Sequence, residues 1–166
     1  MTPKQTNYAT LAGTMIKNLE KRGFIASYAP TGADALEIIR SLLPKGASCA
    51  NGGSMSLAEI GFNNLVTNGD YRYLDRFAAK TQEEKDDVFS KIAVCDYYLM
   101  STNAITTDGV LVNIDGIGNR VASLCFGPKH VVIVCGMNKV CPDLDSAYQR
   151  VKLETAPPNC VRLSRK

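Results

Sequence analysis

Three apolar runs lie close together between Asp96 and Met137, and they limit the folds open to this chain more than any other feature. The runs cover residues 97–100, 110–114 and 131–136, and each is bounded by turn-forming residues. Short apolar runs between turns are typical of buried strands. The loops between these runs are polar and rich in glycine. We therefore expect a sheet whose connecting loops carry the candidate site.

The first fifty residues show helix and strand patterns in alternation. Residues 7–22 repeat apolar side chains at helical spacing, and 24–29 predict a short strand. A capping box at 31–34 predicts a helix that continues to Pro44, and 45–50 predict another short strand. A strand, a helix and a strand joined by short links predict a parallel sheet.

Local signals of the same kind predict the later elements. Residues 63–80 show no sustained period and are expected to form an irregular cover over the site. A capping box at 81–84 predicts a helix, and the Asp-Gly pair at 108–109 predicts a hairpin turn. A short helix is expected over 121–126. The last helix, over 142–155, is expected to end at the paired prolines that follow.

Length and composition narrow the class of protein. A chain of 166 residues suits one domain that spans 1–166. The net charge of +3 is weak and the basic residues are scattered, which argues against a nucleic-acid partner. No run approaches the ~18 apolar residues of a membrane span, and the N-terminus lacks the pattern of a signal peptide. We therefore expect a cytoplasmic protein without a membrane span.

The six cysteines show no spacing typical of metal ligands. In a reducing cytoplasm they are expected to be free thiols, and no metal site is predicted. Cys95, Cys125 and Cys135 have apolar neighbours and are expected to behave as small hydrophobic side chains. Cys135 lies at the end of the predicted strand 131–136, where its thiol could take part in chemistry, but the sequence shows no suitable base.

A Gly-Gly loop leads directly into a predicted short helix at 54–61, and it forms the first candidate site. The junction points free backbone N–H groups and a positive helix end at one spot, which favours an anion. Ser56 and Glu59 also match the S-x-x-E pattern of a helix cap. Two interpretations of Glu59 therefore stay open, as the cap of its own helix or as a group that acts on a proton of the ligand.

The glycine loop at 115–120 is the second candidate site. Its G-x-G pattern permits close backbone approach to a phosphate or carboxylate, and Arg120 is suited to pair with such an anion bidentately. Val121 occupies the third glycine position of the dinucleotide fingerprint, so this loop is not that motif. We expect Glu59 as the catalytic residue, and as ligand-binding residues Gly52, Gly53, Ser54, Ser56, Asn103, Asn113, Asp115, Gly116, Gly118, Asn119 and Arg120.

With these residues in hand, the chain resembles the LUD family, the domain of the lactate-utilisation proteins. The resemblance covers nearly the whole chain and rests on three stretches, GGSMSLAEIG (52–61), YYLMSTNAITTDGVLVNIDGIGNRVASLCFGPKHVVIVCGMNKV (97–140) and LDSAYQRVKLETAPPNCVRL (144–163). It implies a three-layer α/β/α fold around a mostly parallel sheet. This is the fold type shared by sugar-phosphate isomerases, CoA transferases and the folate cyclo-ligase.

The resemblance also implies a function. It indicates a subunit or accessory of an iron–sulfur L-lactate oxidising system, with a small anionic metabolite as ligand and iron–sulfur protein subunits as partners. Two alternatives stay open, a stand-alone enzyme on a CoA-, folate- or nucleotide-like ligand and a non-catalytic module that binds a metabolite. No flavin or nicotinamide motif identifies a cofactor, so the sequence leaves open whether the chain is an enzyme.

Relatives often continue past the Ala-Pro-Pro-Asn sequence at 156–159 into a cysteine-rich tail of metal-binding appearance. This sequence keeps only Cys160 there. Either the sequence is incomplete or this member lacks the tail, and no metal or iron–sulfur site is assigned. Edge strands, or the apolar segment near Phe62 and Leu65, are candidates for pairing subunits in an oligomer.

Overall fold

The computed structural model describes residues 2–164, which form two compact units. Unit 1 consists of the described parts of Met1–Pro30, Thr102–Ile114 and Cys135–Lys166. Unit 2 consists of Thr31–Ser101 and Asp115–Val134. The chain thus leaves unit 2 after Ser101, returns to it at Asp115 and leaves it again after Val134. The expectation of one domain over 1–166 stays a prediction.

Unit 2 is built on a four-stranded parallel sheet with the order β2-β1-β3-β6. Its strands are β1 (Ser48–Asn51), β2 (Arg72–Tyr73), β3 (Tyr97–Met100) and β6 (His130–Ile133). The predicted strand at 97–100 is confirmed, and it lies inside the sheet with its last three residues buried. Strand β6 ends three residues earlier than predicted and forms one edge of the sheet.

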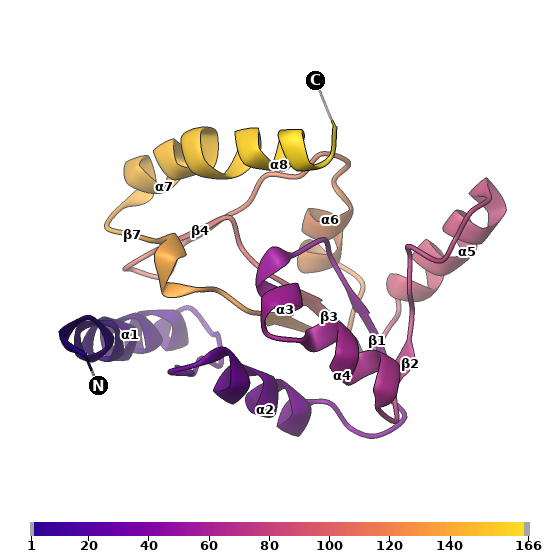
Figure 1. The fold of residues 1–166 in the computed structure, drawn as a ribbon, viewed down its shortest axis with the longest axis horizontal. Helices are drawn as coiled ribbons and strands as arrows, with labels where there is room; N and C mark the ends of the chain where they lie inside the picture. Colours follow the sequence, from indigo (N-terminus) through magenta and orange to yellow (C-terminus); the bar gives the residue numbers. More distant parts are fainter. Residues whose placement is uncertain (1, 165–166) are drawn as a thin grey trace. The chain divides into compact units, whose positions relative to one another are not determined.

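Helices cover both faces of this sheet, because successive side chains of a strand point to opposite faces. On one face Cys49 and Leu99 pack against α2 (Gly32–Leu42), α3 (Met55–Glu59) and α4 (Phe62–Asn68). Figure 1 shows these three helices, in purple and magenta, beside β1 and β3. Phe62 and Leu65 belong to this core, so they are not available for pairing subunits as proposed from the sequence.

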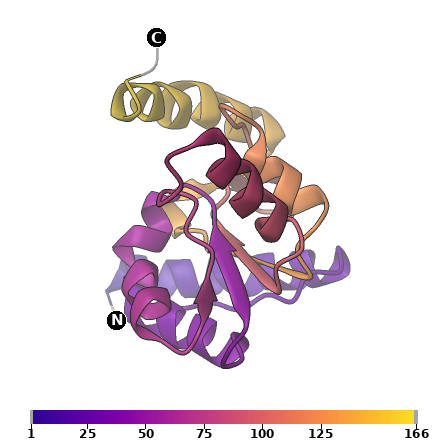
Figure 2. The ribbon, with the colours of Figure 1, turned by 90° about the vertical axis from the view of Figure 1, so that its right-hand side faces the viewer.

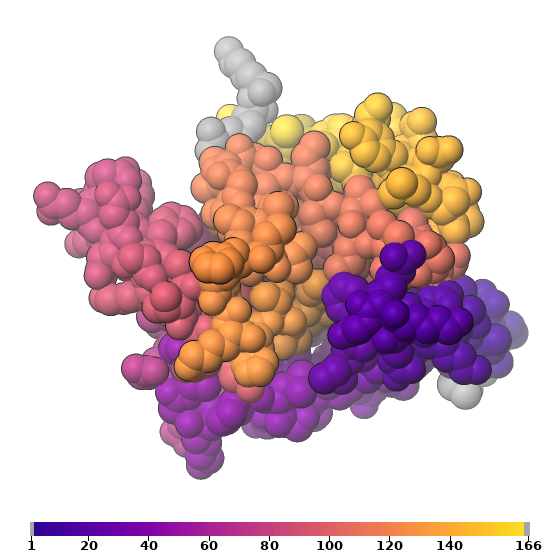
Figure 3. Space-filling view, turned by 180° about the vertical axis from the view of Figure 1, so that it is seen from behind, coloured from indigo at the N-terminus to yellow at the C-terminus, as the bar shows by residue number. Residues whose placement is uncertain are grey.

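On the opposite face Ala50 and Tyr98 pack with side chains of α5 (Gln82–Ile92) and α6 (Asn119–Cys125). Figure 2, viewed from the side of α5, shows the strands of unit 2 between the two groups of helices. In the space-filling view of Figure 3 the surface of α5, in rose, borders that of the segment 115–134. The predicted α/β class, with helices on both faces of a mostly parallel sheet, is therefore confirmed.

Both predicted capping boxes of unit 2 are present. The Thr31 hydroxyl accepts a hydrogen bond from the Asp34 N–H, and the Asp34 carboxylate accepts one from the Thr31 N–H. Thr81 and Glu84 make the same pair of bonds at the start of α5. These boxes satisfy N–H groups that have no partner inside the helix, which is why local sequence predicts both helix starts.

Unit 1 holds the predicted hairpin and a long N-terminal helix. Helix α1 (Pro3–Lys21) begins four residues before the predicted start, because Thr2 and Gln5 form a capping box. The hairpin strands β4 (Ala104–Thr106) and β5 (Leu111–Val112) are antiparallel, as predicted. Strand β7 (Val140–Cys141) pairs with β4 in parallel, and this second sheet is separate from that of unit 2.

The C-terminal part of unit 1 is helical for longer than predicted. A short 3₁₀ helix (Met137–Lys139) precedes β7. After β7 the chain runs through α7 (Leu144–Arg150), a π-helical turn (Val151–Thr155) and α8 (Ala156–Arg162). The expected stop at the paired prolines is wrong. The prolines fall in the first turn of α8, where a missing N–H costs no hydrogen bond within the helix.

Two other expectations are also wrong. Residues 24–29 form no strand, and the Ile25 side chain is fully exposed, so the apolar pattern there does not mark burial. Residues 63–80 are not wholly irregular, because they include most of α4 and all of β2. The βαβ unit predicted near the N-terminus therefore does not exist, and the parallel sheet begins with β1. Within residues 2–164, no helix has the length and hydropathy needed to cross a membrane.

Candidate functional site

The order of strands in unit 2 marks one place where a ligand is expected. After β1 the chain turns to β2 on one side, and after β3 it proceeds to β6 on the other side. The direction of the connections therefore reverses between β1 and β3. In open parallel sheets, ligands bind outside the carboxyl ends of the strands at such a switch point. Here those ends are Asn51–Gly52 and Met100–Ser101.

Arg120 and Asp115 form a buried ion pair at this end of the sheet. Asp115 Oδ1 accepts from Arg120 Nε at 2.8 Å and from Nη2 at 2.7 Å. Arg120 Nη1 donates to the Ser101 carbonyl at 2.5 Å, and Asp115 Oδ2 accepts from the Val121 N–H at 2.7 Å. Arg120 is only 8% exposed. The pair thus fixes the 115–121 loop to the carboxyl end of β3, and each charge neutralises the other.

Gly52 lets the two candidate loops meet. A Cβ at this position would lie 2.9 Å from Tyr98 Oη, and 3.0 and 3.1 Å from Arg120 Cγ and Cδ. Tyr98 is buried and hydrogen-bonds with Ser123 of α6; burial raises the pKa of its hydroxyl. Because only glycine leaves this space, the end of β1 packs directly on the stem of Arg120. The structure therefore brings the Gly-Gly loop and the 115–120 loop together.

Asn51 and Tyr73 join β1 to β2 at the same end. Tyr73 Oη donates to Asn51 Oδ1 at 2.6 Å, and Asn51 Nδ2 donates to the Gly52 carbonyl at 3.0 Å. Burial, together with the nearby Asp75 carboxylate, raises the pKa of the Tyr73 hydroxyl to about 12. Tyr73 therefore stays protonated at neutral pH and acts as a hydrogen-bond donor.

Arg76 lies against the Gly-Gly loop, in the segment that follows β2. Its Nη2 would be 3.3 Å from a Cβ on Gly53, and its guanidinium carbon lies 4.4 Å from the centre of the Phe77 ring. Its charge lowers the pKa values of both Tyr73 and Tyr98. Its Nε is buried and has no hydrogen-bond partner within residues 2–164. Sequence reasoning missed Arg76, Asn51 and Tyr98, since nothing in their local patterns separates them from ordinary loop and strand residues.

The predicted site residues divide between the two units. The predicted residues of the first loop, together with Asp115, Gly116, Gly118, Asn119 and Arg120, all belong to unit 2. Asn103 and Asn113 belong to unit 1. There, Asn103 Oδ1 accepts from the Ile114 N–H at 2.9 Å, and the Asn103 carbonyl accepts from Arg150 Nη1 at 3.0 Å. Their role in orienting a ligand stays a prediction.

The start of α3 differs from the predicted cap. Ser54 is the N-cap, and its hydroxyl accepts from the Leu57 N–H at 3.2 Å. The box formed by Ser56 and Glu59 is therefore wrong as a cap, because Glu59 is the last residue of α3 and lies at its other end. The Glu59 side chain is exposed. Glu59 is therefore not the cap of its own helix, and its role in proton transfer stays a prediction.

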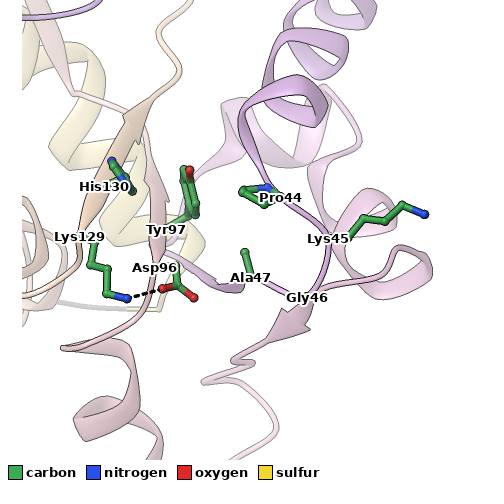
Figure 4. A pocket seen from close by; sticks show the side chains of 8 residues that line it. All are labelled: Pro44, Lys45, Gly46, Ala47, Asp96, Tyr97, Lys129 and His130. Atoms are coloured by element: carbon green, nitrogen blue, oxygen red, sulfur yellow. Dashed lines mark hydrogen bonds and ion pairs between the residues drawn. The ribbon is translucent and has the colours of Figure 1, made fainter.

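An open pocket of about 430 Å³ lies at the opposite, amino end of the sheet (Figure 4). Asp96 lies at its wall and accepts from Lys129 Nζ at 2.7 Å, from Ser48 Oγ at 2.6 Å and from the Ser48 N–H at 2.9 Å. These bonds, that of Lys129 above all, hold the pKa of Asp96 well below its usual range. The Tyr97 and His130 rings stack beside it, 4.8 Å apart. The Asp96 carboxylate thus holds together the starts of β1, β3 and β6, which is a structural role.

The thiols are free, as predicted, and most are unsuited to nucleophilic chemistry. Burial raises the pKa of Cys49 to about 12 and those of Cys95 and Cys135 to about 11, so these thiols stay protonated. The expectation of an apolar environment is wrong for Cys125, which is exposed at the end of α6. Among residues 2–164, no group of three or more His, Cys, Asp or Glu side chains is arranged to hold a metal ion.

Comparison with known proteins finds one family. The model of the LUD domain matches residues 13–166, which is most of the chain. Searches of curated proteins and of solved structures find no match. The match over most of the chain establishes the family.

Proposed function

Because the chain belongs to the LUD domain family, which is associated with lactate-utilisation proteins, we propose that it acts in lactate utilisation by binding a small anionic ligand. The ligand carries a carboxylate or phosphate group and binds at the carboxyl ends of β1 and β3. One observation supports this location above the others: the Gly-Gly loop and the 115–120 loop meet at the switch point of a parallel sheet.

In this proposal the residues of the two loops have different roles. Gly53, Gly116 and Gly118 are exposed and offer backbone to the ligand without side chains in the way. Asp115 and Arg120 hold the loop in place through their buried ion pair. Asn119 and the Ser54 hydroxyl lie at the starts of α6 and α3, at the border of the site. Glu59 is the candidate for proton transfer.

The ligand test uses the wild-type protein in a thermal-shift screen with lactate, pyruvate, inorganic phosphate and CoA. A ligand at about a hundred times its Kd stabilises the protein by ~2.7 kcal/mol, which raises Tm by about 5–10 °C. Gly116→Leu is expected to abolish the shift by filling the rim, and it is expected to fold, since a Cβ at Gly116 meets no atom within 4 Å. Gly13→Leu is the matched control, because Gly13 in α1 is equally open.

A shift that survives Gly116→Leu would overturn the proposed location of the site. A shift lost equally in both variants would mean that the added side chain disturbs folding in general. Wild-type protein that responds to no ligand would overturn the binding function itself.

The role in the cell is proposed to be that of a subunit or accessory of an iron–sulfur L-lactate oxidising system. Tagged protein isolated from cells grown on lactate is expected to carry an iron–sulfur partner, detected by its absorbance and by mass spectrometry. Turnover by the isolated chain on a CoA-, folate- or nucleotide-like ligand would favour the stand-alone enzyme instead. Glu59→Gln that leaves both ligand affinity and growth on lactate unchanged would favour a non-catalytic module.

A further inference from the structure

The two arginines at the proposed site differ in how many of their N–H groups have hydrogen-bond acceptors. Arg120 has a carboxylate on one edge of its guanidinium and the Ser101 carbonyl on the other. Arg76, on the far side of Gly52 and Gly53, has no hydrogen bond to its buried Nε and no ion pair within the described chain. The nearest acid in sequence, Asp75, is exposed and accepts from the Phe77 N–H at 2.9 Å.

A covered guanidinium N–H without an acceptor is unfavourable, because it has lost its hydrogen bonds to water and gained none from the protein. The side chain therefore gains free energy by turning its Nε and Nη2 edge to an acceptor. These two N–H groups are parallel and match two oxygens of a carboxylate or phosphate. Arg76 lies on an irregular segment, and its guanidinium packs on the Phe77 ring.

We propose that Arg76 is the residue that binds the anionic group of the ligand, through Nε and Nη2, above the Gly-Gly loop. This inference rests on the proposed function and names a residue and a chemistry for its site. It differs from the sequence interpretation, which assigned the anion to Arg120. Arg120 acts as a positioning residue, because its donors are already engaged with Asp115 and Ser101.

The surroundings of Arg76 favour a small carboxylate. Its single charge is the one cation here that no described acid pairs, which matches a monoanion better than a phosphate dianion. Tyr73 lies beside it as a protonated hydroxyl. A 2-hydroxy or 2-oxo carboxylate presents the two carboxylate oxygens to Arg76 and keeps a further oxygen for a neighbouring group. Phosphate shares the oxyanion chemistry and is the second arm of the test.

The test compares four proteins by calorimetric titration with L-lactate, pyruvate and inorganic phosphate: wild type, Arg76→Lys, Arg76→Gln and Arg72→Gln. Arg76→Gln is expected to weaken binding by about tenfold or more, the loss of one charge-assisted hydrogen bond. Arg76→Lys keeps the charge and loses the paired donors, so it is expected to weaken binding nearly as much. Arg72→Gln is the matched control, because Arg72 lies close by in sequence, in β2, but contacts Asp96 and Gly46 at the amino end of the sheet.

Each outcome decides the proposal. Unchanged affinity in both Arg76 variants, with wild type binding and Gly116→Leu not binding, overturns the role of Arg76 and leaves the site in place. Absence of binding to wild type overturns both. If Arg76→Gln fails to fold, Arg76→Lys decides, and binding equal to wild type overturns the inference. Tighter binding of phosphate than of L-lactate or pyruvate would overturn the carboxylate assignment.

Discussion

The two ends of the parallel sheet in unit 2 both carry charged groups, but these groups are satisfied in different ways. At the amino end, Asp96 accepts from Ser48 and Lys129, and the three strands β1, β3 and β6 meet around it. At the carboxyl end, Arg120 is equally engaged, yet Arg76 against the Gly-Gly loop has a buried Nε without an acceptor in the described chain.

This difference separates a framework from a site. Side chains whose donors and acceptors are all engaged hold strands in register and leave nothing for a ligand. In our proposal, the unsatisfied donor of Arg76, next to the Gly-Gly loop at a switch point, is the group that binds the ligand. The open pocket of about 430 Å³ lies at the amino end, where the Asp96 carboxylate is already bound by Lys129 and Ser48.

The largest effect is expected from breaking the buried pair at the carboxyl end. Arg120→Ala leaves Asp115 charged and 9% exposed, without its partner. Loss of one member of a buried pair destabilises by about 3–5 kcal/mol. Urea denaturation at pH 7 measures this loss. The exposed pair between Arg22 and Asp108 has a similar distance, 2.9 Å, and Arg22→Ala should cost under about 1 kcal/mol. Equal losses in the two variants would contradict the role assigned to burial.

A smaller effect is expected from closing the space between the two loops. Gly52→Ala places a Cβ within 3.1 Å of the Arg120 stem and of Tyr98 Oη. Such overpacking destabilises by about 1–3 kcal/mol. Gly116→Ala is the control, because it meets no atom within 4 Å and is expected to change the free energy of unfolding by less than about 0.5 kcal/mol. A harmless Gly52→Ala would show that the loops do not need this close contact.

The smallest effect is expected at the amino end and depends on pH. The pKa of Asp96 is lowered by folding, so its stabilising contribution is complete above its ordinary pKa of 3.8 and is lost as pH falls below that value. Asp96→Asn should therefore lower the urea midpoint at pH 7, and the difference from wild type should shrink between pH 4 and pH 2. A difference that stays constant over this range would show that the carboxylate charge does not matter.

The sequence predicted those parts of the fold that depend on neighbouring residues. The boxes at Thr31 and Thr81, the hairpin at Asp108-Gly109 and the strand at 97–100 are all determined within a few residues. The wrong predictions concern segments whose structure depends on residues far away in the sequence. Residues 24–29 have the composition of a strand but pair with no neighbour, and the paired prolines were compatible with a helix because they fall in its first turn.

The candidate site was predicted only in part, for the same reason. Its two loops were recognised from glycine, but the contact between Gly52 and Arg120 depends on the order of strands. The choice between Arg120 and Arg76 depends on which guanidinium has an acceptor. Both the contact and the free donor depend on the tertiary structure, so a pattern of neighbouring residues does not predict them. Arg76 sits in the segment Asp75-Arg76-Phe77, whose composition is that of any surface turn.

The Arg120 contacts also affect how the chain folds. The chain leaves unit 2 after Ser101 and returns at Asp115, and Arg120 binds to both of these residues. Arg120 thus links the two residues of unit 2 that flank the segment 102–114, Ser101 and Asp115. Bringing loop ends together costs entropy that grows only slowly with loop length. Because this link lies within unit 2, the return of the chain to β6 does not depend on the length of the excursion between Ser101 and Asp115.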